Sequence, residues 1–207
     1  MKNDKLQSEV KLKLIETAGE LFATKGFKST TIREICQKAN ANVAAVNYHF
    51  GDKETLYQAA FEHVCTYLDK LHDPIDDSLA PEEKLHEFIR RRVRSFIDKN
   101  IPAWHSMLLH QGRIRREGKV QKSFLKIIEA RSSRLKKILC ELTGLSEKAE
   151  ELIYIKFSIM GQILFYNKLP QFRIPDRQYM KSKYLDEIVE HIYKFSMMGM
   201  GLGHLIK

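Results

Sequence analysis

Apolar residues recur along this chain at the spacing of helices. They lie three and four positions apart through most of the sequence, and no stretch shows the alternation of a half-buried strand. The pattern predicts an all-α protein with helices over about 10–26, 31–39, 43–48, 53–71, 81–100, 102–112, 119–142, 146–168 and 181–198. An acidic segment with a proline, residues 72–78, predicts a boundary between a part at 1–50, continued by a connecting helix to about 71, and a part at 72–207.

Residues 30–53, TTIREICQKANANVAAVNYHFGDK, predict two short helices joined by a tight turn. Thr31 can cap the first helix while Glu34 reaches back to it, as in a capping box. Asn40 is one of the few residue types that adopt a left-handed backbone at low cost, so it suits the turn. Asn42 can cap the second helix, and Gly51 can end it. This arrangement is typical of a helix-turn-helix module that binds DNA.

The second of these helices carries small or hydrogen-bonding residues that suit close approach to a DNA groove. They are Ala44, Ala45, Asn47, Tyr48 and His49. Asp52 can cap a third helix, whose first residue, Lys53, would lie beside free backbone N–H groups. A helix start of this kind favours a phosphate.

The segment from about Val10 to Tyr57 resembles the N-terminal DNA-binding domain of the TetR/AcrR family of bacterial transcriptional regulators. The resemblance is carried by Lys25-Gly26-Phe27, Thr30-Thr31, Tyr48-His49-Phe50 and Lys53-Glu54-Thr55-Leu56. Asn40 stands where the family usually has glycine, and Asn47 where it often has tyrosine. The segments PEEKLHEFIRRRV and MGQILFYNKLP also resemble the effector domain of the CecR-like (YbiH-like) branch.

The resemblance implies an N-terminal three-helix head that contacts DNA and a C-terminal helical domain for effector binding and dimerisation. The expected DNA contacts are Thr30, Thr31, Asn42, Ala44, Ala45, Asn47, Tyr48, His49 and Lys53. Each has a plainer alternative, since a lysine can be solvated, a histidine can cap a helix and an exposed asparagine can bind only water. Residues expected to line an effector cavity are Trp104, Met107, Gln162, Phe165 and Tyr166, although their helical spacing fits ordinary core as well.

The last two long helices carry more apolar surface than a small bundle needs, so they are the expected dimer interface, as in the family. The interface residues expected are Ile155, Ile159, Ile163, Ile188, Ile192 and Phe195. Two copies would place two heads on a palindromic operator, and an effector would favour a head spacing that no longer fits.

The formal net charge of +9 does not mark the DNA-binding surface. Residues 1–60 hold 9 Lys/Arg and 7 Asp/Glu, whereas residues 90–137 hold 15 and 3. The basic excess therefore belongs to the expected effector domain. These basic residues either form a solvated helix face or attract an anionic effector or the DNA that flanks the operator.

The remaining features limit the classes of function. No apolar run approaches the roughly 18 residues of a membrane span, and the polar start predicts a cytoplasmic protein without a signal peptide. The three cysteines lack metal-ligand spacing, and no nucleophile or phosphate-loop motif occurs, so we expect neither metal, cofactor nor enzyme. The prediction is a dimeric, ligand-responsive repressor. The alternatives are a small-molecule-binding protein whose head contacts protein, and, less favoured, an enzyme that uses the effector cavity.

Overall fold

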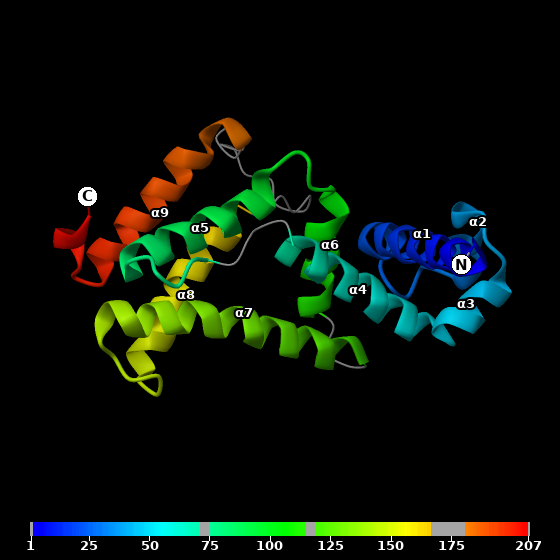
Figure 1. Ribbon diagram of the computed structural model, residues 1–207, viewed down its shortest axis with the longest axis horizontal. Helices are drawn as coiled ribbons and strands as arrows, with labels where there is room; N and C mark the ends of the chain where they lie inside the picture. The colour runs from blue at the N-terminus through cyan, green and yellow to red at the C-terminus, as the bar shows by residue number, and fades with distance from the viewer. Residues whose placement is uncertain (1, 71–74, 115–118, 167–180, 207) are drawn as a thin grey trace. The chain divides into compact units, whose positions relative to one another are not determined.

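Helices make up the regular structure of this chain, as the apolar spacing predicts. The computed structural model describes residues 2–70, 75–114, 119–166 and 181–206, and within them there is no strand (Figure 1). The helices are α1 Lys2–Lys25, α2 Ile32–Ala39, α3 Val43–Phe50, α4 Lys53–Lys70, α5 Pro81–Ile97, α6 Ala103–Ile114, α7 Lys119–Thr143, α8 Glu150–Phe165 and α9 Leu185–Gly199. Two 3-10 turns, η2 Ser182–Tyr184 and η3 Gly203–Leu205, flank α9. The irregular stretch predicted at 170–176 lies outside the described residues.

The chain divides into two compact units that are not continuous in sequence. The first, called the head unit below, consists of residues 1–71 and 102–128, and the second, the C-terminal unit, consists of 72–101 and 129–207. The sequence predicts a single boundary near 71. Residues 102–128 group with the head unit, and α6 within them packs on α1 and α4.

In the head unit, α1 is the central helix and packs against α2, α4 and α6. Its inward face is buried, and Phe22 meets the ring of Tyr57 edge-on with centroids 4.9 Å apart. Phe27, in the turn after α1, stacks on Phe22 at 5.6 Å. Aromatic pairs of this geometry add about 0.5–1.5 kcal/mol beyond the area they bury, so this cluster fixes α4 against α1.

The contact between α1 and α6 is unusually close at one glycine. A Cβ atom added at Gly19 would lie 2.4 Å from a ring carbon of Trp104, so only glycine leaves room for the indole there. Near the other end of α6, the side-chain amide of Gln111 donates a hydrogen bond of 2.9 Å to the carbonyl oxygen of Ala23. Both contacts tie α6 to the helix that carries the head.

In the C-terminal unit, α5 and α9 lie side by side, and α8 packs against both (Figure 1). The core between these helices and the second half of α7 is mainly apolar, and its buried polar side chains include Tyr193, Ser95 and Ser196. Ion pairs close its edges: the Lys84 ammonium lies 2.9 Å from the Glu141 carboxylate, and His86 lies 2.7 Å from Glu190. α5 is therefore joined to α7 and to α9 by both apolar and polar contacts.

Candidate nucleic-acid interface

The turn between α2 and α3 has the geometry that its sequence predicts. The hydroxyl of Thr31 accepts a hydrogen bond of 3.2 Å from the backbone N–H of Glu34. Asn40 has a φ of 51°, in the left-handed region. The carboxamide oxygen of Asn42 accepts from the N–H of Ala44 at 2.9 Å, and Gly51, with φ 75°, ends α3. These local contacts, together with the packing of α3 on α1 and α4, set the direction of α3.

One detail of the first helix start differs from the prediction. Glu34 does not complete a capping box, because its carboxylate pairs with the Lys25 ammonium at the end of α1. That ion pair is the main reason why the pKa of Glu34 lies below its usual value. A second ion pair, Lys38 to Glu20 at 3.0 Å, also joins α2 to α1. The position of α2 is thus set by α1 as well as by its own cap.

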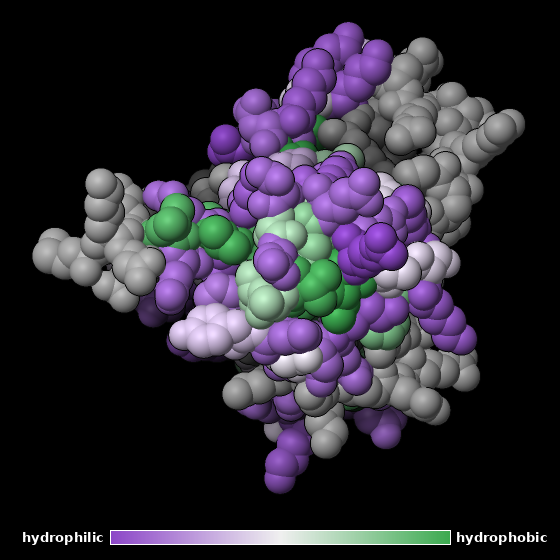
Figure 2. Space-filling model, turned by 90° about the vertical axis from the view of Figure 1, so that its right-hand side faces the viewer, coloured by the Kyte–Doolittle hydropathy of each residue, from purple (hydrophilic) through white to green (hydrophobic). Residues whose placement is uncertain are grey.

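α3 has one buried and one exposed face. Val46 and Phe50 are buried in the head, and residues three and four apart on the other side, Ala44, Asn47 and Tyr48, are exposed. Tyr48 is 75% exposed, far more than a packing residue would be. Figure 2, seen from the side where α2 and α3 lie in Figure 1, shows a small hydrophobic patch bordered by hydrophilic side chains.

The other predicted contact residues differ in how far they reach solvent. Thr31 and Asn42 are exposed at the two helix starts, while Ala45 and His49 are half-buried. Val43, the first residue of α3, is apolar and yet 42% exposed. Val43 is a candidate contact that sequence reasoning missed, because the first residue of a helix can face either way.

Two residues predicted to contact DNA have structural roles in this fold. The side chain of Thr30 is fully buried, and its hydroxyl donates to the carbonyl oxygen of Gly26 at 2.8 Å. The ammonium of Lys53 donates to the carbonyl oxygens of Phe27 and Thr30, each at 2.9 Å. It also lies 4.4 Å from the centroid of the Phe27 ring, a cation–π contact. The prediction for Thr30 is corrected, and two of the three donors of Lys53 are already used.

The start of α4 is nevertheless capped as predicted. The Asp52 carboxylate accepts a hydrogen bond of 2.6 Å from the backbone N–H of Thr55. Two cations near this face, Lys28 and Arg33, are exposed, and neither has an ion-pair partner among the described residues. They are further candidates for phosphate contact, and the sequence offered no signal that separated them from other surface cations.

The residues expected to line an effector cavity are divided between the two units. Trp104 and Met107 belong to α6, where Trp104 packs on Gly19 within the head unit. In the C-terminal unit, Gln162 is half-buried and donates to the Ser158 carbonyl oxygen at 3.4 Å. Phe165 is exposed, and Tyr166 packs on the edge of the core, where burial raises its pKa.

Most of the expected dimer residues are also placed otherwise. Four of them are buried within a single chain: Ile159, Ile163, Ile188 and Ile192. Ile155 is half-buried, and Phe195 is exposed. The four buried side chains cannot meet a second copy, so their assignment to the interface is corrected. The exposed large apolar residues of α8 and α9 are instead Ile153, Tyr154, Phe157, Phe165, Phe195 and Met198.

The described part of the chain holds no group of three or more histidine, cysteine or acidic side chains that could bind a metal ion. Cys36, Cys65 and Cys140 are free, and burial raises the pKa of the Cys36 thiol. Across the described residues no helix is long and apolar enough to cross a membrane.

Two family descriptions match this chain. Residues 14–60 match the bacterial regulatory proteins of the tetR family. Residues 81–200, more than half of the chain, match the C-terminal domain of the HTH-type transcriptional dual regulator CecR. The first match contains the whole of α2 and α3, and the second begins at the first residue of α5.

Curated relatives match over part of this chain. An uncharacterised HTH-type transcriptional regulator, YerO of Bacillus subtilis, is 35% identical over 95 residues, 44% of this chain and 32% of its own. The HTH-type transcriptional repressor Rv3405c of Mycobacterium tuberculosis is 35% identical over 65 residues, 31% of this chain and 35% of its own. The chain therefore spans about a third of the length of these relatives.

Solved structures match over nearly the whole chain. AibR, in a crystal structure with isovaleryl coenzyme A and operator DNA, has a TM-score of 0.65 at 17% identity, covering 90% of this chain and 97% of AibR. A transcriptional regulator from Rhodococcus sp. Rha1 has a TM-score of 0.68 at 14% identity, with 91% and 96% covered. At these identities the likeness establishes the fold alone.

Proposed function

Because the chain belongs to the tetR family of bacterial regulatory proteins and carries a C-terminal domain of the CecR type, we propose that it is a transcriptional regulator of the cytoplasm. In this proposal it is a ligand-responsive repressor that binds a palindromic operator as a homodimer. The observation that carries the proposal is the exposed face of α3, which is polar and small where a groove-binding helix must be.

On this face each side chain has a distinct task. Ala44 and Ala45 leave space for the major groove and can contact thymine methyl groups. Asn47 and Tyr48 carry the hydrogen-bonding groups that reach furthest from the helix, so we assign base or phosphate contacts to them. Thr31, Asn42 and His49 lie at helix ends, where contact with the DNA backbone is the simplest role.

In this proposal exposed cations neutralise the phosphates of the operator DNA. Lys28 and Arg33 supply positive charge that no described ion pair uses. Lys53 contributes at most its one remaining donor, together with the free N–H groups at the start of α4. The affinity for DNA should accordingly fall with salt, with a log–log slope of about −0.9 for each phosphate neutralised.

The proposed dimer uses the exposed apolar faces of α8 and α9. Tyr154, Phe157 and Phe165 form one stripe on α8, and Phe195 and Met198 lie on the exposed side of α9. An exposed set of this size on two adjacent helices favours a protein contact over solvent. In a two-fold dimer the same stripes would meet each other, and each dimer would present two heads.

Ligand response rests on the C-terminal unit. AibR binds both isovaleryl coenzyme A and operator DNA in its crystal structure, and it shares the fold of this chain. We infer that this chain likewise binds a small molecule in its C-terminal domain, and that the ligand changes the affinity for the operator.

The test is selection of DNA from a random duplex library by the full chain, followed by fluorescence anisotropy with the enriched duplex. Tyr48→Ala should weaken binding about tenfold or more while the free energy of unfolding changes by less than about 0.5 kcal/mol. Phe50→Ala is the contrasting variant, because truncating a buried aromatic costs about 3–5 kcal/mol. Enrichment of no duplex, or full affinity of Tyr48→Ala, would reject the DNA-binding role and leave the protein-contact alternative.

A further inference from the structure

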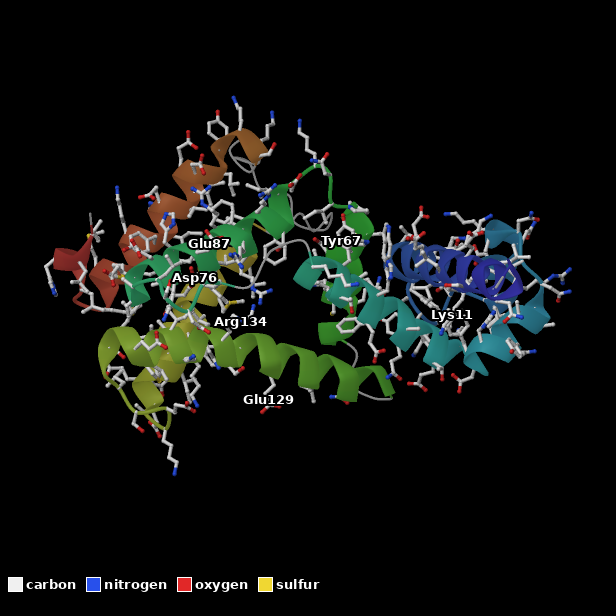
Figure 3. All side chains as sticks on the ribbon, viewed as in Figure 1. Lys11, Tyr67, Asp76, Glu87, Glu129 and Arg134 are labelled. Atoms are coloured by element: carbon white, nitrogen blue, oxygen red, sulfur yellow. The ribbon has the colours of Figure 1, made fainter. Side chains whose placement is uncertain are left out.

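A surface pocket of about 560 Å³ lies within the C-terminal unit, beside the contact between α5 and α9. Its walls come from the loop before α5, the first three turns of α5, α9 and η3. Asp76 and Glu87, labelled in Figure 3, mark two of these walls. A volume of this size accommodates a small organic molecule.

The lining is strongly acidic although the chain as a whole is basic. Five carboxylates face the pocket against one guanidinium: Asp76, Glu82, Glu83, Glu87 and Glu190 against Arg91. Glu87 is paired with Arg91 at 2.6 Å, and Glu190 lies 2.7 Å from His86. These two carboxylates are compensated within the pocket wall.

The other three carboxylates form no ion pair among the described residues, although hydrogen bonds from Ser78 and, to a smaller extent, the charge of Lys84 lower the pKa of Asp76. Asp76 accepts from the backbone N–H of Ser78 at 2.9 Å, and Glu83 accepts from that of Ala80 at 3.2 Å. Glu82 is half-buried and has no described hydrogen bond or ion pair. Asp76 and Glu83 are exposed and Glu82 is half-buried. Like charges gathered at one site repel one another, and a bound cation would relieve that repulsion.

Tyr193 is an independent sign that the pocket holds a ligand. Its side chain is only 7% exposed and lines the pocket, and its hydroxyl has no hydrogen-bond partner within the described part of the chain. Its ring meets His86 edge-on at 5.1 Å, so the side chain is held in place. Because the hydroxyl has no protein partner and lines the pocket, it is available to form a hydrogen bond with a ligand there.

The hydroxyl of Tyr193 stays protonated at neutral pH. Burial raises its pKa, and the negative charges of Glu82, Glu190 and Glu83 raise it further. The pocket therefore offers a phenol and a set of carboxylates, with Leu79 and Leu205 supplying apolar wall.

We infer that this pocket binds an organic cation with an ammonium group and a small apolar body. The ammonium would lie against Glu82, Asp76 and Glu83, and the body against Leu79, Leu205 and the ring of Tyr193. An anionic compound of the same shape would be repelled. The inference rests on the proposed function only in regarding this ligand as the effector.

Three probes that share an aromatic body and differ in charge test the pocket: 2-phenylethylammonium, 2-phenylethanol and 3-phenylpropanoate. Calorimetric titration of the full chain should give about tenfold tighter binding for the ammonium than for the alcohol, and no binding of the carboxylate. Equal binding of ammonium and alcohol, or tightest binding of the carboxylate, would overturn the inference. Binding of magnesium chloride alone, with no response to the ammonium probe, would overturn it too.

Three variants test whether the ammonium probe binds in this pocket. Glu82→Gln removes one uncompensated charge and should weaken the ammonium probe about fivefold, and Tyr193→Phe should weaken it about threefold. Glu151→Gln, which makes the same charge change at an exposed position on α8, is the matched control and should leave affinity unchanged. If all three variants bind alike, the probe binds elsewhere.

This test is independent of DNA. If the chain binds the ammonium probe but selects no duplex, the pocket inference holds and the proposed DNA-binding function is rejected. If the chain binds DNA but not the probe, the proposed DNA-binding function holds and the pocket inference is rejected.

Discussion

At the scale of single residues, Lys53 carries the largest change of interpretation. Its place in the first turn of α4 predicts a phosphate contact, because a helix start exposes N–H groups. The ammonium instead holds the turn after α1, through the carbonyl oxygens of Phe27 and Thr30. The sequence could not reveal this, since the two carbonyls lie 26 and 23 residues earlier and meet Lys53 only after the head has folded.

Lys53→Met is therefore expected to weaken folding before it weakens DNA binding. The variant keeps the apolar stem and removes the ammonium, which leaves two part-buried carbonyl oxygens without their donor. The free energy of unfolding should fall by about 1–3 kcal/mol in urea denaturation.

Lys28→Met is the matched control, because Lys28 is exposed and lies on the same head. It should leave stability unchanged within about 0.5 kcal/mol. If Lys53→Met leaves stability unchanged and reduces the slope of log DNA affinity against log salt concentration by about one, Lys53 contacts a DNA phosphate after all.

At the scale of elements, the junction of α1, α4 and α6 contains a histidine in an unusual state. His105 on α6 is 3% exposed, between the rings of Trp104 at 4.2 Å and Tyr67 at 4.8 Å. Its Nδ1 is buried without a hydrogen-bond partner in the described structure. Burial and, to a smaller extent, the nearby His63 lower the pKa of His105 to about 4.

The packing of this junction should consequently depend on pH. The folded-state pKa, about 4, lies below the usual 6.5, so between these values the unfolded chain binds more protons. Stability contributed by neutral His105 is fully present above about pH 6.5 and falls as the pH drops toward 4, by at most about 3 kcal/mol. Urea denaturation across this range measures the slope.

His105→Phe separates this effect from the titration of carboxylates. Phenylalanine has a similar shape and no proton to gain. The variant should therefore lose less stability on acidification than the natural chain does. Parallel pH profiles for the two proteins would show that His105 is charged at no cost in the fold.

The same scale shows why some helix boundaries can be predicted and others cannot. Asn40, Asn42 and Gly51 act through local backbone chemistry, so the sequence alone places them correctly. Ser146 is also a good cap by type, yet α8 begins only after Ala149, and the Ser146 hydroxyl accepts from Lys148 in the preceding turn. Competing local hydrogen bonds of similar strength are not separable from sequence.

At the scale of the whole molecule, the family and the all-α fold follow from sequence, whereas the side of each C-terminal helix that faces inward does not. α8 has apolar residues around most of its circumference, so its periodicity cannot distinguish the buried Ile159 from the exposed Phe157. Packing against α5 and α9 makes that choice. For this reason the sequence pattern alone wrongly predicts that Ile159, Ile163, Ile188 and Ile192 lie in a dimer interface.

The exposed faces lead to a prediction about assembly. Phe157→Glu and Met198→Glu place a charge on side chains that solvent already reaches, so each monomer should fold normally, while a dimer that buries these positions must desolvate the charge without a partner. Light scattering should report monomers, and operator affinity should fall about a hundredfold or more because the second head no longer binds within the same molecule.

Two further variants serve as controls. Ser182→Glu places a charge at an exposed position off these faces and should stay dimeric. Ile159→Glu places a charge in the core and should unfold the C-terminal unit. Folded dimers of both Phe157→Glu and Met198→Glu with full affinity would place the interface on another surface.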